Sequence, residues 1–580
     1  MKKTIAISII TSAMLFGATV TNLSTDQVNQ VTGSTLDDVT LDQGKTAISG
    51  SANVDTLTIT QRGATAAETG NSVTNLTING NTSSTTLVSQ GTTDVSNSTV
   101  HNVTIDSDSI INGGSVSGAG ELTQGKTAVG GGSTLENVGI ESTNTINNAA
   151  ISASGSSEGF LVTQGTLSVS GDANASDATA NLIDLSSTNI IDDGVSIADS
   201  RVEQALTQID GSGTTASGLN LLQENTLNGT GVITNGSIVL QAVTKIDTGA
   251  DVHGLKTNVK NNMNSLNSDN STVVQNHINI HTDSVVTNMD ISTGGTNHNT
   301  ISNVSATDST ITQNTYNITN GSNINGITAV HDNIISNSTF NGAHIGQDLV
   351  DINNSTLTAP VAFNSTNSIT NMNVVGANNE IHQAVTVINN ATVTAPTLTS
   401  NNSISGVDLD NTEISQSSVS IANTTAVVDL VLNNTNTVND TDGIGNDMNN
   451  SKIIQAQFMM SEGSINNLNQ LTTNTIEDNQ VVGSNISQAT ISLHASSVTN
   501  VDMDATNTMR NNDIDTSDVE QNALRICDGS TVTGLTVNQS NEISGTTVTG
   551  SSLTQGTVNI GDVSDCTNNL VAVDHRHKSF

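Results

Sequence analysis

Glutamine recurs at near-regular intervals along the 580 residues, and this periodicity limits the possible folds more than any other feature of the chain. The first interval is 47 residues, and the later intervals run from 33 to 40 residues. Such a period is typical of stacked repeats, in which each unit buries its apolar face only against its neighbours. The repeating glutamines are Gln43, Gln90, Gln124, Gln164, Gln204, Gln241, Gln275, Gln313, Gln347, Gln383, Gln416, Gln455, Gln488, Gln521 and Gln555.

Apolar residues keep the same phase in successive repeats. Val498 and Met509, for example, recur 34 positions later as Val532 and Ile543. Within a repeat, stretches rich in Val, Ile and Thr alternate with Gly, Asn, Asp and Ser about every 11 residues, a pattern typical of short strands and turns. Helices are disfavoured, because Gly, Asn, Thr and Ser are poor helix formers. We therefore expect an all-β fold: a parallel β-solenoid, most simply a right-handed β-helix, of about 15 coils with three short strands per coil.

A second marker is an asparagine followed two places later by an apolar residue, with Asp108 at that place in an early repeat. Asparagine tolerates left-handed turn conformations, so we expect this marker at a corner of each coil. Stacked amides can hydrogen-bond along the axis, as in cross-β ladders. We predict one ladder of the glutamines from Gln124 to Gln555 and a second of Asn299, Asn333, Asn367, Asn402, Asn474, Asn507 and Asn541. The alternative is that these amides only fill turns in a low-complexity chain.

The first residues are typical of an export signal, because Lys2 and Lys3 precede an apolar stretch that runs from residue 5 to 18. The predicted organisation is a signal peptide at 1–22, an N-terminal cap or lead-in at 23–42, the solenoid array at 43–565, and a C-terminal cap or tail at 566–580. An exported chain can form disulfides. A bridge between Cys527 and Cys566 and a pair of free thiols both remain open.

Charge and composition exclude several functions. A net charge of −39 with only 14 Lys and Arg opposes nucleic-acid binding, which needs basic residues to displace counterions. The mature chain has no run of 18 apolar residues, so no transmembrane helix is expected. We expect no enzyme, no catalytic or metal site and no cofactor. The segment 442–450 matches only a single loop of a calcium-binding roll, whereas such rolls need tandem copies, so it gives a weak indication of Ca²⁺.

The Gln-Gly steps, for example at Gln43 and Gln90, together with the asparagine markers, carry a resemblance to known families. They are similar to curlin-type and Fap-type functional amyloids, and the coil pattern is similar to that of β-helix surface adhesins of bacteria. The repeats are longer than curlin repeats, and the closely spaced terminal cysteine pair of Fap subunits is missing. The resemblance implies a secreted or cell-surface structural and adhesive protein, or a biofilm-matrix protein able to form fibres. Its partners would be itself or components of the cell surface and matrix.

Two other functions are compatible with the sequence. The segment Thr56–Thr60, with sequence TLTIT, fits the Thr-x-Thr rows of an ice-binding face. Asp192, Asp193 and His253 are similar to parts of pectin-degrading hydrolases, although the remaining elements of that pattern are absent from suitable positions. A polysaccharide-degrading enzyme would also need two carboxylates at a set separation in a cleft.

Overall fold

The computed structural model shows a chain made of strands β1 to β51, with no helix among the residues that it describes. It describes residues 14–561 apart from 17–18, 27–28, 33–34, 38–39, 50, 62–70, 80–85, 118–119, 153–159, 172, 176–182, 193–194, 230–231, 235, 266, 293–298, 377, 424, 440–445 and 528.

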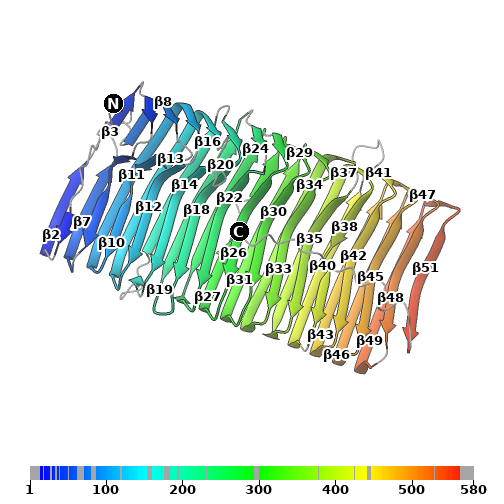
Figure 1. Cartoon of the computed structure of the whole chain (residues 1–580). Coiled ribbons are helices and arrows are strands. Elements are labelled where there is room, and N and C mark those ends of the chain that lie inside the picture. Colours follow the sequence, from blue (N-terminus) through cyan, green and yellow to red (C-terminus); the bar gives the residue numbers. More distant parts are fainter. Residues whose placement is uncertain are drawn as a thin grey trace.

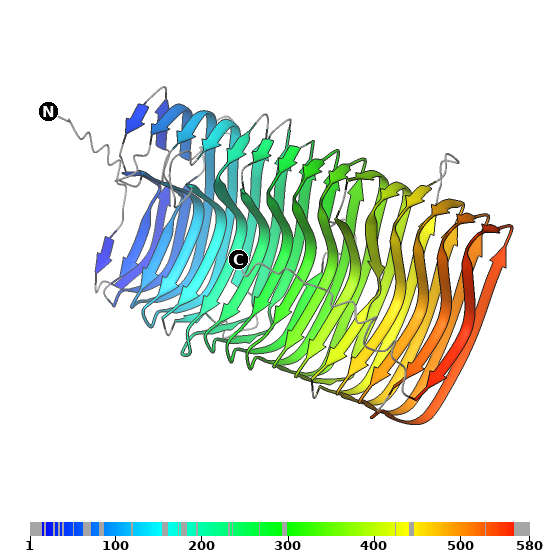
Figure 2. The same ribbon diagram turned by 45° about the vertical axis from the view of Figure 1, so that its right-hand side comes forward.

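The strands pair in parallel with their counterparts one coil before and one coil after, which confirms the predicted β-solenoid. The coils follow one another along a single axis, from the blue N-terminal end to the red C-terminal end (Figures 1 and 2). The stack has about 12 turns, slightly fewer than the 15 coils expected from the glutamines.

The coil between Gln488 and Gln521 shows the repeating path. Gln488 lies in β45 (Asn485–His494), which belongs to a 19-stranded sheet, here called the glutamine sheet. The chain then enters a second sheet, here called the asparagine sheet, through β46 (Ser497–Arg510) and β47 (Asp513–Asp515). It returns to the glutamine sheet in β48 (Asp518–Ile526), which carries Gln521.

The 11-residue spacing predicts three strands of similar, short length in each coil. The strands of this coil differ in length instead: β45 has 10 residues, β46 has 14 and β47 has 3. β46 has 14 residues because Asn500, with a φ of 55°, bends the chain without ending the strand. Asn511 has a φ of 52° and lies at the corner after β46. Asparagine tolerates this left-handed conformation because its short side chain can bond locally. These corner asparagines are different residues from the asparagine markers.

The apolar interior is divided into two columns that run along the axis. One column contains Val350, Leu357 and Phe363, which follow Gln347 in the chain. The other contains Ile345, just before Gln347, and Ile369, later in the same coil. Each column is continuous from coil to coil because successive coils pair in register. The division between the columns coincides with the positions of the buried amides.

Strands also occupy part of the sequence predicted as signal and lead-in. β1 (Met14–Phe16) pairs with β6 (Thr46–Ser49), and β2 (Thr19–Asp26) pairs with β7 (Asn53–Gln61). Residues 1–13 and the predicted tail at 566–580 lie outside the described residues. The described part of the chain contains no helix with the length and hydropathy needed to cross a membrane.

Candidate functional site

The fifteen repeating glutamines form one continuous ladder inside the solenoid. Each glutamine from Gln90 to Gln555 donates a hydrogen bond from Nε2 to Oε1 of the glutamine one coil before it, at 2.7–2.9 Å. From Gln43 to Gln521 these side chains are at most 1% exposed. A buried amide is costly unless it is hydrogen-bonded, and the neighbouring coils supply that bond.

The marker asparagines form a second ladder on the facing sheet. From Asn144 to Asn507, each Nδ2 donates to Oδ1 of the marker one coil later, at 2.7–3.0 Å, through Asn189, Asn225, Asn261, Asn299, Asn333, Asn367, Asn402, Asn436, Asn474 and finally Asn541. The donors of this ladder therefore point toward the C-terminal end, whereas those of the glutamine ladder point toward the N-terminal end.

The predicted corner position of these asparagines is wrong. The markers lie within strands with buried side chains, as Asn402 does in β37 (Pro396–Asp410). Their pattern, with an apolar residue two places later, reflects two inward-facing positions of one strand. The assignment of Asp108 to this column is also wrong, because the register pairs Asn144 with Ser109 and places Asp108 opposite Thr143.

The two ladders contact each other across the interior. Gln313 Nε2 donates to the backbone oxygen of Asn299 at 2.9 Å, and Asn314 Nδ2 donates to Asn333 Oδ1 at 2.5 Å. In a later coil Ser417 Oγ donates to Asn436 Oδ1 at 2.8 Å. The amides thus form a polar partition between the two apolar columns. Because each amide bonds to the amide of a neighbouring coil, the partition links every coil to the next in register.

A buried polar chain that the sequence did not suggest interrupts one apolar column. Tyr316 in β30 (Thr310–Ile318) is hydrogen-bonded to His331 Nε2 in β31 (Asn323–Ser336). His331 Nδ1 lies 3.3 Å from Asp348 Oδ1 in β33 (His344–Asn353). Burial raises the pKa of Tyr316 well above its usual value, and the nearby Asp348 charge adds to the increase. All three side chains are buried, so a substrate cannot reach them from outside.

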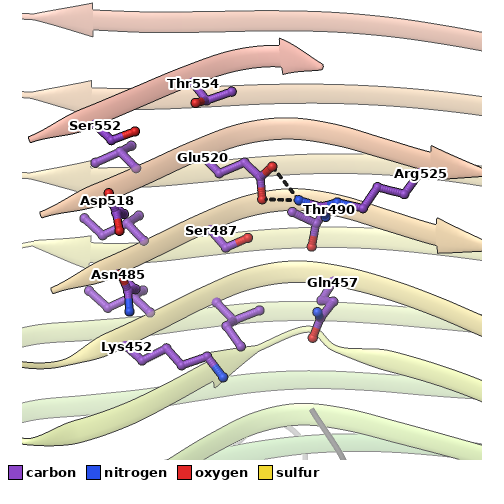
Figure 3. A pocket seen from close by; sticks show the side chains of 14 residues that line it. Lys452, Gln457, Asn485, Ser487, Thr490, Asp518, Glu520, Arg525, Ser552 and Thr554 are labelled. Carbon is purple, nitrogen blue, oxygen red and sulfur yellow. Dashed lines mark hydrogen bonds and ion pairs between the residues drawn. The ribbon is translucent and has the colours of Figure 1, made fainter. Parts of the chain in front are cut away.

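The outer face of the glutamine sheet carries a hollow of 530 Å³ over β42 (Lys452–Ser461), β45, β48 and β51 (Ser552–Ile560). Figure 3 shows polar side chains from successive strands around it. Arg525 Nη2 bonds both carboxylate oxygens of Glu520, at 2.5 and 2.7 Å, and Lys452 Nζ bonds Glu413 Oε1 at 3.0 Å. Both cations are thus paired with carboxylates, and the hollow presents no excess positive charge to an anionic ligand.

Further along the same face, Glu380 lies between two histidines. His344 Nδ1 is 2.9 Å and His382 Nε2 is 3.6 Å from Glu380 Oε2. The hydrogen bond with His344, followed by that with His382, holds the pKa of Glu380 far below its usual range. Within the described ranges, no group of three or more His, Cys, Asp and Glu side chains is placed to hold a metal ion. The segment 442–450 is described only from Asn446 onward.

The structure separates the residues of the hydrolase-like pattern. Asp192 ends β16 (Ile183–Asp192), whereas His253 ends β23 (Asp251–His253) and lies 3.0 Å from the carboxylate of Asp251. Asp193 lies outside the described residues.

The threonine row at Thr56–Thr60 does not continue along the solenoid. Thr56 has a φ of 59° and therefore lies at a bend of β7. Thr58 pairs with Thr104, and the next residue in that column is Gly139. The column thus loses its threonine within two coils, whereas an ice-binding face needs repeated rows.

Cys527 is buried and disulfide-bonded. The predicted partner Cys566 lies outside the described residues.

In comparisons with known proteins, neither a protein-family model nor a curated protein sequence matches the chain.

Proposed function

We propose that this chain is an exported structural protein of the cell surface or the biofilm matrix, with an adhesive role. The observation that carries the proposal is the uninterrupted amide ladder from Gln43 to Gln555, buried as far as Gln521, which joins the coils into one rod. A rod built this way offers a long repetitive surface, as a scaffold requires. The ice-binding and polysaccharide-degrading alternatives have less support, because the threonine column ends and Asp192 and His253 lie in separate strands.

The surface charge supports the same proposal. A net charge of −39 keeps an exported rod soluble and opposes binding to anionic polymers. The N-terminal pattern of Lys2, Lys3 and the apolar stretch supports export. The expected components are therefore a removable signal, a rigid rod and contacts with other surface or matrix material.

Fractionation of a bacterial host that produces the full chain tests the proposal. We expect the protein in the surface or extracellular fraction, with a new N-terminus near residue 23 by mass spectrometry. A matched chain without residues 1–22 should stay in the cell. Cells that export the protein should also show higher surface attachment than cells producing the matched chain. Retention of the uncut full chain in the cytoplasm would overturn export, and unchanged attachment would overturn the adhesive role.

A further inference from the structure

At the C-terminal end of the described solenoid, apolar side chains are exposed at positions whose counterparts in the preceding coil are buried or partly buried. Val558 and Ile560 in β51 are 56% and 73% exposed. Leu524, which pairs with Val558 one coil earlier, is only 3% exposed. Among the described strands, β51 pairs only with β48. This end therefore combines an apolar surface with a strand edge, the combination that templates the addition of another strand.

The glutamine ladder has complementary groups at its two ends. Gln43 Nε2, at the N-terminal end, is buried without a hydrogen-bond partner. Gln555, at the other end, donates to Gln521, and its own Oε1 occupies the position that accepts a bond in every earlier coil. A donor without an acceptor at one end thus matches an available acceptor at the other end. The direction of the ladder permits only head-to-tail matching.

The ends of the two sheets are also stepped. Among the described residues, the last strand of the glutamine sheet is β51, which follows β49 (Thr531–Ser544) and β50 (Thr547–Thr549) of the asparagine sheet in the chain. The glutamine sheet therefore extends one strand further than the asparagine sheet, whose last row is β49 and β50.

At the N-terminal end the asparagine sheet begins with β2, β3 (Asn29–Thr32) and β4 (Thr35–Asp37), one row before β7 and β8 (Asn71–Asn79). Within the described part of the chain, β1 alone supplies the glutamine sheet with a strand in that same row. Removal of residues 1–22 takes away β1 and the first four residues of β2, and leaves residues 23–26 of β2 with β3 and β4. With β1 gone, the asparagine sheet extends one row further than the glutamine sheet. This step is the complement of the step at the C-terminal end.

We propose that removal of the export signal allows the C-terminal end of one molecule to dock onto the N-terminal end of a second copy. In this joint β51 pairs in parallel with β5 (Thr40–Gln43) and β6, and Gln555 Oε1 accepts a hydrogen bond from Gln43 Nε2. Ile560 then lies opposite Ile48, because each follows its glutamine by five residues. The joint repeats the packing of coil on coil that already holds the rod together. This inference rests on the proposed export of the chain.

The test compares three proteins incubated at micromolar concentration and observed by electron microscopy and light scattering. The mature chain from residue 23 should form filaments many times longer than one rod. The full chain with residues 1–22 should remain as discrete rods, each no longer than one molecule of about 12 turns, or roughly 60 Å. Mature Val558→Lys should elongate at least tenfold more slowly, because it places a charge in the joint.

Leu222→Lys in the mature chain is the matched control. Leu222 lies in β20 (Leu219–Asn228), in the middle of the rod, and is 44% exposed. This variant should elongate like the unchanged mature chain, and both lysine variants should keep the β-sheet circular dichroism of the folded protein. Discrete rods from the mature chain would contradict end-to-end joining. Elongation of Val558→Lys at the rate of the unchanged mature chain would contradict the placement of Val558 in the joint. Equal elongation of the full chain would overturn control by the signal. Export, measured separately by fractionation, can fail or succeed independently of these results.

Discussion

At the scale of single residues, the main physical problem is a row of amides in an apolar interior. A buried amide without a partner costs about 1–3 kcal/mol for each unsatisfied group. In the middle of the ladder both groups of Gln347 are satisfied, since Nε2 donates to Gln313 and Oε1 accepts from Gln383. Each glutamine thus depends on the glutamines one coil before and one coil after it. This dependence explains why the spacing of the glutamines is so visible in the sequence.

Replacement of Gln347 tests this dependence. Gln347→Ala leaves Gln313 Oε1 and Gln383 Nε2 without their partners, so we expect a local loss of about 2–6 kcal/mol, or 1–3 for each group. Native-state hydrogen exchange in β30, β33 and β35 (Asn379–Asn389) measures the loss. Gln480→Ala, at an exposed position, is the control and should change stability by less than about 0.5 kcal/mol. Equal exchange in the two variants would contradict a stabilising role of the ladder.

At the scale of strands and corners, the path of each coil depends on residues with a left-handed backbone. Ala495 has a φ of 47° and is exposed, and Gly529 occupies the corresponding region of the next coil with a φ of 78°. The left-handed conformation costs a residue with a Cβ about 1–2 kcal/mol, whereas glycine adopts it freely. Alanine at this corner therefore carries backbone strain.

We expect Ala495→Gly to stabilise the protein by about 0.5–1 kcal/mol, because the relief of strain exceeds the entropy cost of glycine. The matched control is Ala505→Gly within β46, where the backbone φ is not positive, and it should destabilise by about 0.5–1 kcal/mol. The midpoint of urea unfolding, followed by circular dichroism, compares the two variants. A lower midpoint for Ala495→Gly than for the unchanged protein would contradict the strain argument.

The strands also show how far the sequence can predict this fold. Inward-facing residues such as Val498 and Met509 keep their phase, so the repeat and the parallel stack could be inferred from periodicity. The length of β46 could not, because Asn500 bends the strand without ending it. The corner role given to the asparagine markers was wrong because asparagine suits both a left-handed corner and a buried ladder.

The clusters of side chains were harder to predict than the repeat. Tyr316, His331 and Asp348 lie in three different strands of two successive coils. They meet only because each occupies an inward position at a different distance from its glutamine. The outer hollow depends likewise on the shape of the glutamine sheet, which periodicity alone does not determine. A ladder glutamine occupies the same position in every coil, so its repetition is visible in the sequence. Each of these clusters instead depends on residues that occur in only one or two coils.

At the scale of the whole molecule, charge controls how rods meet. The net charge of −39 is carried along a rod, so side-by-side contact brings many like charges together, whereas an end-to-end contact brings together few. At an ionic strength of about 0.01 M the Debye length is roughly 30 Å, and such charges repel across the gap between rods. Head-to-tail growth is therefore favoured over lateral association at neutral pH and low salt.

We expect mature filaments to remain one rod wide at pH 7 and low salt and to bundle laterally near pH 4.1, the isoelectric point calculated from the sequence. Carboxylates are largely ionised at pH 7, and many become protonated near pH 4, so lowering the pH removes the lateral repulsion. Filament width by electron microscopy measures the change. Salt at about 1 M and pH 7 provides the control, because it reduces the Debye length to roughly 3 Å without protonating carboxylates. Bundling at low pH alone would indicate an acid-induced structural change, whereas single filaments under both conditions would show that charge does not limit lateral contact.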